Sequence, residues 1–316
     1  MSIQSGAEDG PLDEAPARDV AAARRRLINV AYRMLGSLAD AEDVVQETYA
    51  RWYGLTADEQ AAILVPDAWL TTVASRLCLN LLTSARVRRE SYVGEWIPEP
   101  VPEFSGIVHG SSRDVGIDPA DRVTLDESID MAFLVMLEAM TPAERVSFIL
   151  HYVFRYSFAE VADVVGRTPA ACRQLASSAR RRLRGAVTPS APSASQAVIV
   201  RDFKLAWESG DIEGLIDLLA PDAVVTSDGG GRVNTVLHPI EGADRIAGAV
   251  VRLEQTLRDL TLEEHTVNGR PGLIARRNGV TVSVYAFQVT EERITHIWAV
   301  RNPEKLRPWI SADSPA

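Results

Sequence analysis

Residues 157–184 constrain the fold of this chain more than any other segment, because their pattern predicts two helices joined by a very short turn. Ser157 and Glu160 have the spacing of a capping box, which marks a helix start, and apolar residues follow at helical intervals. Gly166 is typical of a helix end, and Thr168 of the start of the next helix. This arrangement predicts a helix-turn-helix, whose second helix enters the major groove of DNA.

The second of these helices is strongly basic. Between Gly166 and Gly185 there are six arginines and no acidic residue. Such a helix suits DNA, with its first turns at base edges and its last turn near phosphates. The candidate base-reading residues are Arg173, Gln174 and Ser177, and the candidate phosphate contacts are Arg180, Arg181, Arg182 and Arg184. The alternative is a packed helix pair whose basic end is only solvated.

The distribution of charge along the chain supports a DNA partner, although the net charge does not. A net charge of −10 over 316 residues would by itself argue against nucleic acid. However, residues 66–90 carry +2 and residues 131–185 carry +4, whereas residues 91–130 between them carry −7. Two basic segments that flank an acidic one are typical of a protein that touches DNA at two places, with a connector held away from the DNA or in a basic channel.

Length and composition predict two or three domains, each with its own core, since 46% of the 316 residues are hydrophobic. No apolar run approaches the roughly 20 residues of a membrane span, and the acidic start does not resemble a signal peptide. We therefore expect a cytoplasmic protein with no membrane partner. Cys78 and Cys172 lack metal-site or redox spacing, so both are expected to be buried, and no metal or cofactor is expected.

Residues 20–90 predict an all-helical domain, with a first helix over residues 20–35 and a second from Asp40. The second helix has an apolar stripe through Val44 and Val45. Its opposite side carries a row of polar residues that a lone helix would leave in water, namely Asp43, Gln46 and Glu47.

A third helix of this domain begins at Pro66 and ends in a basic run that contains Arg86, Arg88 and Arg89. The apolar residues expected to form its buried stripe are Trp69, Leu70, Val73, Leu77 and Leu81. Because Trp69 lies in this stripe, we interpret it as a core residue rather than as a platform for base stacking.

The whole chain is predicted to be a multidomain protein with two all-α domains followed by an α+β domain. The expected segments are a disordered tail (1–19), a helical domain (20–90), an acidic linker (91–124), a four-helix domain that ends in the helix-turn-helix (125–187), a Pro/Ser-rich linker (188–195) and a C-terminal α+β domain (196–316). Two further capping boxes, Thr124 with Glu127 and Thr141 with Glu144, mark helix starts in the four-helix domain.

In the C-terminal domain, two helices over about 196–209 and 212–220 precede a strand near 223–226, a Gly-rich turn, another strand and a helix over 243–256. Further strands are expected at 263–267, 273–277, 280–289 and 293–301. Asn-Gly pairs at 268–269 and 278–279 predict tight hairpin turns between them. Helices followed by a curved antiparallel sheet predict a helix-filled cone.

The last two predicted strands offer a candidate ligand pocket. Tyr285 and Phe287 share one strand face, and His296 and Trp298 share a face of the next strand. A pocket lined by these aromatic rings and one imidazole would hold a small-molecule ligand or perform acid–base chemistry. A histidine satisfied within the core is the simpler interpretation, and no paired carboxylates or nucleophile–base pair can be assigned.

Three motifs, in one order, resemble conserved regions of the extracytoplasmic-function (ECF) sigma factors of bacterial RNA polymerase. They are DAEDVVQETYARWY from Asp40, PDAWLTTVASRLCLNLLTSARVRRE from Pro66, and the helix-turn-helix, so the resemblance covers about residues 20–185. The C-terminal domain resembles the SnoaL-like domains that a few such sigma factors carry. WIPEP (96–100), DGGGR (228–232) and NPEKL (302–306) are similar to short motifs of that subgroup.

The resemblance implies a protein that directs core RNA polymerase to specific promoters and helps to initiate transcription, without enzymatic activity. Its partners would be promoter DNA and the β′ coiled coil and β subunit of core polymerase, with Asp43, Gln46 and Glu47 docking on the coiled coil. The helix-turn-helix would bind the minus-35 element. The implied minus-10 contacts are Arg76, Asn80, Arg86, Arg88 and Arg89.

Some residues depart from the family pattern. Arg76 stands where Asn is usual, Asn80 where Asp is usual and Thr83 where Arg is usual, so the resemblance does not imply a promoter sequence. In the recognition helix, Cys172 replaces a usual aliphatic residue and Ser178 a usual Arg. One phosphate contact of the family is therefore expected to be missing.

We also predict that the C-terminal domain regulates the sigma unit by contacting it, in place of a separate anti-sigma protein, because the short linker at 188–195 keeps the domain close to both helical units. The polar residues proposed to contact that unit are Asp228, Arg232, Asn302 and Lys305, and the alternative for each is a local turn or cap contact. The acidic linker, with Glu95, Glu99, Glu103 and Asp114, would by analogy enter the polymerase channel, or would simply be a solvated tether. DGGGR is interpreted as a turn that needs glycine, because no helix follows to form a phosphate site.

Two other classes of function remain open from the sequence. One is a ligand-responsive helix-turn-helix regulator that acts without core polymerase and dimerises on a palindromic site. The other is an enzyme with a DNA-binding appendage. The polar row at Asp43, Gln46 and Glu47 distinguishes them from a sigma factor, because neither alternative needs a face that docks on polymerase.

Overall fold

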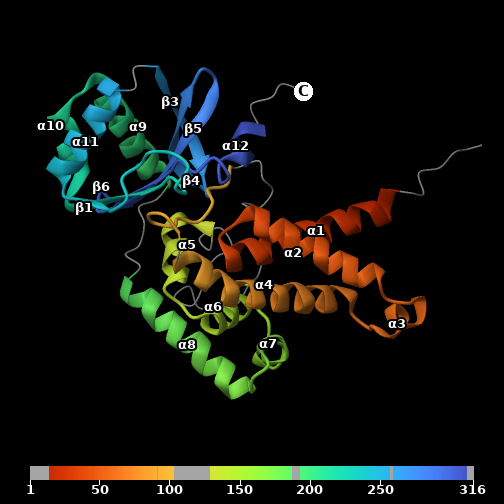
Figure 1. Ribbon diagram of the computed structural model, residues 1–316. Coiled ribbons are helices and arrows are strands. Elements are labelled where there is room, and N and C mark those ends of the chain that lie inside the picture. The colour runs from red at the N-terminus through yellow and green to blue at the C-terminus, as the bar shows by residue number, and fades with distance from the viewer. Residues whose placement is uncertain (1–13, 91, 103–128, 187–192, 257–258, 312–316) are drawn as a thin grey trace, which may run out of the picture.

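The computed structural model describes residues 14–90, 92–102, 129–186, 193–256 and 259–311. It contains a helical body, made of α1 to α8, and a C-terminal domain in which α9 to α12 accompany a six-stranded sheet (Figure 1). The order of the elements, with helices followed by a sheet, is the predicted one. Among the described residues, no helix is both long enough and apolar enough to cross a bilayer.

The first part of the body contains four helices. They are α1 (Glu14–Leu35), α2 (Leu38–Tyr53), α3 (Ala57–Ala62) and α4 (Pro66–Glu90). α1 begins at Glu14, within the stretch expected to be a disordered tail; residues 1–13 lie outside the described residues. α2 begins at Leu38 because the Ser37 side chain accepts a hydrogen bond from the Asp40 backbone N–H at 3.2 Å. The short α3 was not predicted.

The buried stripe of α4 differs from the predicted one. Leu70 is buried as expected, but Trp69, Val73, Leu77 and Leu81 are only half-buried. The residues that face the interior are instead Leu70, Ala74, Cys78 and Leu82. Small side chains at Ala74 and Cys78 let a neighbouring helix approach closely, while the larger ones cover the sides of the contact. Apolar residues cover a wide arc of this helix, so the sequence alone did not show which of them lie closest to the core.

The second part of the body contains the remaining helices. They are α5 (Met131–Glu138), α6 (Pro142–Phe148), the π-helix η4 (Ile149–Val153), α7 (Phe158–Val165) and α8 (Pro169–Ala186). The capping box of Thr141 and Glu144 at the start of α6 is confirmed, with both reciprocal hydrogen bonds present. The box predicted at Thr124 and Glu127 lies outside the described residues. The π-helical turn was not predicted.

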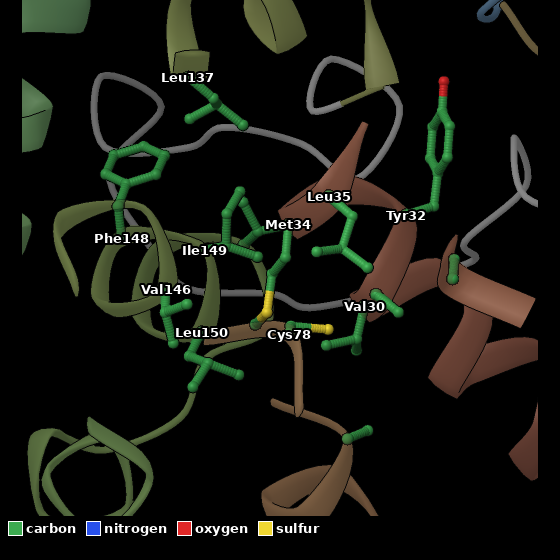
Figure 2. Close-up of a cluster of buried hydrophobic side chains, with 14 of the residues drawn as sticks. Val30, Tyr32, Met34, Leu35, Cys78, Leu137, Val146, Phe148, Ile149 and Leu150 are labelled. Carbon is green, nitrogen blue, oxygen red and sulfur yellow. The ribbon is translucent and has the colours of Figure 1, made fainter. Parts of the chain in front are cut away.

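The two parts of the helical body share one hydrophobic core. Figure 2 shows Val30 and Met34 of α1 and Cys78 of α4 beside Ile149 and Leu150 of the second part. This differs from the expectation of a separate core for each domain. Each fully buried Leu, Ile or Met side chain contributes about 1.5–3 kcal/mol, so the shared core holds the two parts together.

The C-terminal domain follows the predicted element order closely. Its elements are α9 (Ser193–Ser209), α10 (Ile212–Leu218), β1 (Leu219–Asp228), β2 (Ile240–Glu241), α11 (Ala243–Thr256), β3 (Leu260–Val267), β4 (Arg270–Arg277), β5 (Val280–Thr290), β6 (Arg293–Val300) and α12 (Arg307–Ser311). The strand order is β2-β1-β6-β5-β4-β3, and only β1 and β6 pair in parallel. The Asn268-Gly269 and Asn278-Gly279 turns have positive φ at both residues, as predicted.

The two faces of this sheet pack against different partners. One face is covered by α9, α10 and α11, with Phe203, Trp207 and Leu215 among its core residues. The other face packs Trp298 and Val300 together with Ile97, Met131, Leu306 and Trp309. Ile97 lies in the segment expected to be an acidic linker and Met131 begins α5, so the second face of the sheet is buried against this segment and the helical body.

Candidate functional site

The helix-turn-helix has the predicted local structure. The Ser157 side chain accepts a hydrogen bond from the Glu160 backbone N–H at 3.3 Å, and the Glu160 carboxylate accepts one from the Ser157 backbone N–H at 2.7 Å. Gly166 ends α7 with a left-handed φ of 70°, which glycine adopts without strain. Thr168 then accepts a hydrogen bond from the Ala171 backbone N–H at 3.2 Å at the start of α8.

α8 buries one side in the helical body and exposes the other. Cys172, Ala176 and Ala179 form part of the buried side. The base-reading candidates, which all lie on the exposed side, are Arg173, Gln174 and Ser177. The Arg173 guanidinium lies 5.2 Å from the centroid of the Phe158 ring, a cation–π contact that holds its side chain over the first helix of the motif.

The candidate phosphate contacts of α8 lie in different surroundings. Arg181 is exposed. Arg180 is half-buried, with its guanidinium 5.1 Å from the centroid of the Tyr152 ring. Arg182 lies 3.2 Å from the Glu144 carboxylate, so a phosphate would have to compete with that carboxylate for it. The side chain of Arg184 lies outside the described part of the structure.

On α4, the minus-10 candidates Arg76 and Asn80 are both exposed. The Arg76 side chain donates a hydrogen bond to the backbone oxygen of Asp163 in α7 at 2.7 Å. This residue therefore contacts the helix-turn-helix in the described conformation. Three more candidates, Arg86, Arg88 and Arg89, belong to the last turns of α4, but their side chains are not described.

The polar row of α2 lies on the surface. Its candidate residues, Asp43, Gln46 and Glu47, are all exposed, and Val44, Val45 and Thr48 are buried on the opposite side. Glu47 forms an ion pair with Arg51, one turn later, at 2.8 Å. The helix therefore presents a mainly acidic and amide surface to solvent, as its sequence pattern predicts.

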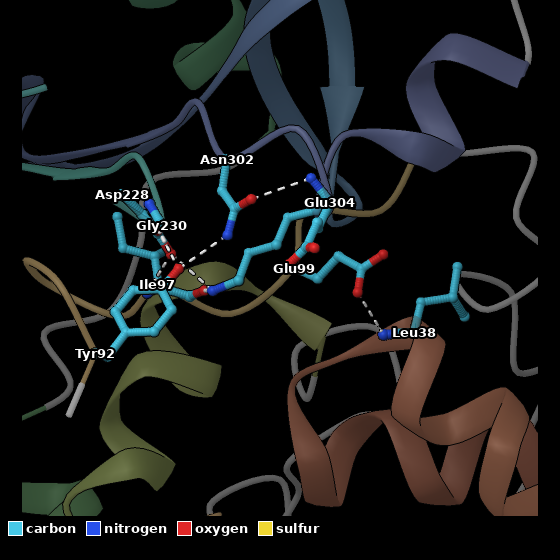
Figure 3. A network of polar contacts seen from close by, with 9 residues as sticks. Leu38, Tyr92, Ile97, Glu99, Asp228, Gly230, Asn302 and Glu304 are labelled. Carbon is cyan, nitrogen blue, oxygen red and sulfur yellow. Dashed lines mark hydrogen bonds and ion pairs between the residues drawn. The ribbon is translucent and has the colours of Figure 1, made fainter. Parts of the chain in front are cut away.

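A buried carboxylate, Asp228 at the end of β1, joins the C-terminal domain to residues 92–102 (Figure 3). One carboxylate oxygen accepts hydrogen bonds from the Tyr92 hydroxyl at 2.7 Å and the Gly230 backbone N–H at 3.0 Å. The other accepts one from the Ile97 backbone N–H at 3.0 Å and lies 2.7 Å from the Lys305 ammonium. The side chain is fully buried, and all four contacts satisfy its negative charge.

Asn302 and Lys305 complete this junction. The Asn302 amide donates a hydrogen bond to the Tyr92 hydroxyl at 2.9 Å and accepts one from the Glu304 backbone N–H at 3.0 Å. Lys305 donates to the Ile97 backbone oxygen and lies 4.1 Å from the centroid of the Trp96 ring. The three short motifs WIPEP, DGGGR and NPEKL therefore meet in one place.

Arg232 occupies a different position from the other three regulatory candidates. It forms an exposed ion pair with Glu304 of its own domain at 2.6 Å. The glycines before it have a clear role: a Cβ on Gly230 would collide with the Asn302 amide, and one on Gly231 would lie 3.0 Å from the Val93 side chain. DGGGR is thus a turn that packs closely against its neighbours, in line with its interpretation as a turn.

Glu99, expected in a solvated or channel-entering linker, is instead buried against α2. Its carboxylate accepts a hydrogen bond from the Leu38 backbone N–H at 2.8 Å, at the start of that helix. Burial raises the pKa of Glu99 to about 7, although hydrogen bonds from Leu38, Ala39 and Ser37 and the nearby charge of Lys305 oppose the shift. Glu103 and Asp114 lie outside the described residues.

Two buried polar residues, Asn268 beside the junction and Arg145 within the helical body, were not predicted from the sequence to be buried. The Asn268 amide donates to the Tyr32 hydroxyl and to the Ile129 backbone oxygen, both at 2.9 Å, and accepts from the Val101 backbone N–H at 3.0 Å. The Arg145 guanidinium donates to the Met34 backbone oxygen at the end of α1 at 2.9 Å. An Asn-Gly turn normally lies at the surface, so the sequence pattern at Asn268 did not indicate that this residue is buried.

The predicted pocket formed by His296, Trp298, Tyr285 and Phe287 is wrong, because the two pairs lie on opposite faces of the sheet. Tyr285 and Phe287 belong to the core under α9 to α11, whereas Trp298 packs toward the helical body. The His296 and Trp298 rings stack with centroids 5.6 Å apart, and burial lowers the pKa of His296. Strand register pairs Tyr285 with Ala299, so Tyr285 shares a face with Ala299, and the neighbouring residue Trp298 lies on the opposite face.

Comparisons with known proteins agree with this geometry. Residues 20–88 match the model of Sigma-70 region 2, and residues 130–183 match Sigma-70, region 4. The chain is 36% identical over 299 residues to the ECF RNA polymerase sigma factor SigJ of Mycobacterium tuberculosis, covering 90% of this chain and 91% of that protein. It is 34% identical over 286 residues to the probable ECF RNA polymerase sigma factor SigI of the same species, covering 90% and 92%.

The crystal structure of M. tuberculosis SigJ is similar to the whole arrangement. It superimposes with a TM-score of 0.72 at 30% sequence identity, covering 95% of this chain and 99% of the SigJ chain. The likeness therefore includes the helical body and the C-terminal sheet domain together. Two sigma-70 regions in the expected order, and relatives similar over nearly their full length, establish that this chain belongs to the ECF sigma factors of RNA polymerase.

Proposed function

We propose that the described conformation is a closed form of this sigma factor, held by the shared core of the helical body together with the C-terminal domain. This closed form must open before both promoter elements are bound. The observation that carries the proposal is the hydrogen bond from Arg76 of α4 to Asp163 of α7. It brings the helix implicated in minus-10 binding against the motif implicated in minus-35 binding.

The distance between promoter elements makes this closed form incompatible with binding both. The minus-35 and minus-10 positions are about 25 base pairs apart, or roughly 85 Å along B-DNA at about 3.4 Å per base pair. Even a fully extended chain from Asp163 to Pro169 at the start of α8 spans only about 20 Å. Because Asp163 contacts α4, the two DNA-binding helices are too close together in this conformation.

In the open form, we expect α8 to read the minus-35 element through Arg173, Gln174 and Ser177. Arg181 is placed to contact phosphate, while Arg180 and Arg182 would first leave Tyr152 and Glu144. We assign the exposed row of Asp43, Gln46 and Glu47 to core polymerase, because it is polar, accessible and unused within the described structure except for the Glu47–Arg51 pair. Arg76 and Asn80 are the proposed minus-10 contacts with described side chains.

The junction at Asp228 is the part of the closed form that connects the C-terminal domain to the helical body. Tyr92 and Ile97 follow α4 in the chain, and both donate to the same carboxylate. Asn268 and Trp309 add further links, since the Trp309 indole donates to the Pro100 backbone oxygen at 2.8 Å. A domain that holds this segment from several sides restrains the separation of the two halves of the body.

Run-off transcription with core polymerase tests the proposal. The Asp228→Asn variant weakens the pair with Lys305 and should raise transcription from the cognate promoter several-fold relative to the full wild-type chain. The matched control is Arg232→Gln, which changes the same turn but breaks only the exposed pair with Glu304. Equal transcription by wild type and a folded Asp228→Asn variant would contradict the closed-form proposal. A regulator that acts without polymerase is not favoured, because both sigma-70 regions match.

A further inference from the structure

The C-terminal domain contains a cavity of about 360 Å³ between α9, α11 and the covered face of its sheet. Its volume is within the range of sites that bind small molecules. The rings of Phe203, Trp207 and Tyr285 form part of the wall. The aliphatic residues of the wall include Ile246, Val250, Leu253 and Ile297. This cavity lies on the opposite face of the sheet from His296 and from the junction at Asp228.

One charged group stands in this apolar wall. Among the described residues that line the cavity, Arg301 is the only one that carries a charge. Its guanidinium donates a hydrogen bond to the Asn234 backbone oxygen at 2.6 Å, which leaves further N–H groups of the same fork for another acceptor. Burial raises the pKa of Tyr285, and a hydrogen bond with Ser283 and the positive charge of Arg301 oppose this shift, so the charge of Arg301 acts on this residue of the cavity wall.

We propose that this cavity binds a small, largely apolar molecule that carries one carboxylate, and that its occupation is coupled to the junction at Asp228. The apolar wall would bury the body of the molecule. Arg301 would hold the carboxylate through charge-assisted hydrogen bonds, which are stronger than neutral ones. The lining residues that are described include no carboxylate and no histidine, so the site is suited to binding rather than to acid–base chemistry.

The coupling depends on a loop that lines the cavity on one side and contacts the segment after α4 on the other. Asn234, Thr235 and Val236 line the cavity. The same loop packs tightly on itself, since a Cβ on Gly229 would lie 2.7 Å from the Thr235 methyl group. On its other side, a Cβ on Gly94 would lie 3.5 Å from the Leu237 side chain. The wall of the cavity and the surface that contacts the segment after α4 are therefore parts of one short loop.

The two residues that follow β6 provide a second connection between cavity and junction. Arg301 lines the cavity, and the next residue, Asn302, belongs to the junction. The backbone N–H groups of both donate to the Asp228 backbone oxygen, at 2.8 and 2.9 Å. The cavity is formed while the junction is closed, and a molecule that binds this form more tightly than the open form stabilises the closed form.

Binding is tested on the full chain with three probes that share one ring system. Isothermal titration calorimetry would compare 1-naphthoate, 1-naphthylmethanol and 1-naphthylmethylammonium. The carboxylate should bind at least about tenfold more tightly than the ammonium, with the alcohol between them, because only the carboxylate complements Arg301. An absence of saturable binding by 1-naphthoate, or an equal affinity for all three probes, overturns the proposal.

Two variants locate the site. Ala249→Phe fills the cavity and should abolish binding of 1-naphthoate, whereas Ala197→Phe, at a half-buried position of α9 outside the lining, should not. Arg301→Gln should reduce affinity for the carboxylate about tenfold and leave affinity for the alcohol unchanged, and Arg201→Gln serves as its control. If Ala249→Phe does not fold, Arg301→Gln decides. A retained preference for carboxylate in that variant overturns the site.

The coupling depends on the closed form proposed above, and its test does not require polymerase. Linkage is reciprocal, so loosening the junction must weaken binding in the cavity. Asp228→Asn, which does not line the cavity, should lower affinity for 1-naphthoate at least about threefold. Wild-type affinity in this variant overturns the coupling. A variant that binds more weakly but transcribes like wild type would contradict the closed form as an inhibited state and leave the coupled site intact.

Discussion

Polar side chains are arranged in opposite ways in the recognition helix α8 and in the junction around Asp228. In α8 the candidate residues Arg173, Gln174 and Arg181 are exposed. In the junction, Asp228 is fully buried and Lys305 nearly so, and each has several partners within the chain. The polar groups of α8 are available to another molecule, whereas those of the junction already bind partners within the chain.

This difference separates recognition from restraint. An exposed charge adds little to stability, because water and salt screen it, but it retains its capacity for DNA or protein partners. A buried pair is costly to break, because removal of one partner leaves the other charged without compensation. Substitutions in α8 and α2 should therefore change binding to DNA or polymerase with little change in stability, whereas substitutions in the junction should lower stability.

The largest effect is expected from Asp228→Ala, which leaves the Lys305 ammonium without its carboxylate in a buried position. We expect the free energy of unfolding to fall by about 3–5 kcal/mol, as for other broken buried pairs. Chemical denaturation of the full chain measures it. Arg232→Ala, which removes an exposed pair, should cost about 1 kcal/mol or less. Similar losses in both variants would remove the distinction between buried and exposed groups.

The second-largest effect is expected from Glu99, as a pH dependence of the free energy of unfolding. Because the pKa of Glu99 is raised to about 7 in the folded state, folding favours its protonated form. Its contribution to the free energy of unfolding is therefore complete below about pH 4.5 and is lost as the pH rises through 7. The corresponding loss is about 2–3 kcal/mol between pH 5 and 8. Denaturation curves of wild type and Glu99→Gln should diverge with pH over this window. A parallel pH dependence in both proteins would show that Glu99 is not responsible.

In α8, Arg173→Ala should weaken binding to the cognate minus-35 element by about 1–3 kcal/mol and relax selectivity there. Arg181→Ala should instead weaken binding to all sequences and lower the salt slope by about one unit. Titrations of holoenzyme against cognate and scrambled elements at several salt concentrations separate the two. Neither variant should change the unfolding midpoint. Equal losses on both sequences for Arg173→Ala would remove it from the base-reading set.

The smallest of these effects is expected from Glu47→Lys on α2. Charge reversal in the proposed polymerase-docking row should weaken binding to core polymerase about tenfold, which corresponds to about 1.4 kcal/mol. Loss of the exposed pair with Arg51 should cost about 0.5 kcal/mol of stability at most. Asp58→Lys on α3 is the matched control, with the same reversal at another exposed acid. Unchanged affinity in a folded Glu47→Lys protein would exclude this row as the docking surface.

Local patterns predicted the helix-turn-helix and the element order of the C-terminal domain well. Capping by Ser157 and Glu160, the left-handed Gly166, and the two Asn-Gly hairpins each depend on residues only a few positions apart. Such features are short-range consequences of backbone geometry and hydrogen bonding. The exposed candidates of α2 and α8 followed from the same logic, because a polar row opposite an apolar stripe faces away from the core.

Long-range contacts decided what those patterns left open. Whether the two helical parts have separate cores or one depends on how helices distant in sequence pack, and the apolar residues of α4 permit both. Likewise, strand register placed His296 and Tyr285 on opposite faces of the sheet.

The sequence by itself determined most of the helices and strands and the exposed polar rows of α2 and α8. Only the tertiary structure decided that Glu99 and Asn268 are buried, and that Asp228 meets Tyr92 and Lys305. A polar residue in a linker or a turn is exposed by default, because burial without partners is costly. It becomes buried only where chain segments far apart in sequence supply those partners, and such assembly is a property of the whole fold.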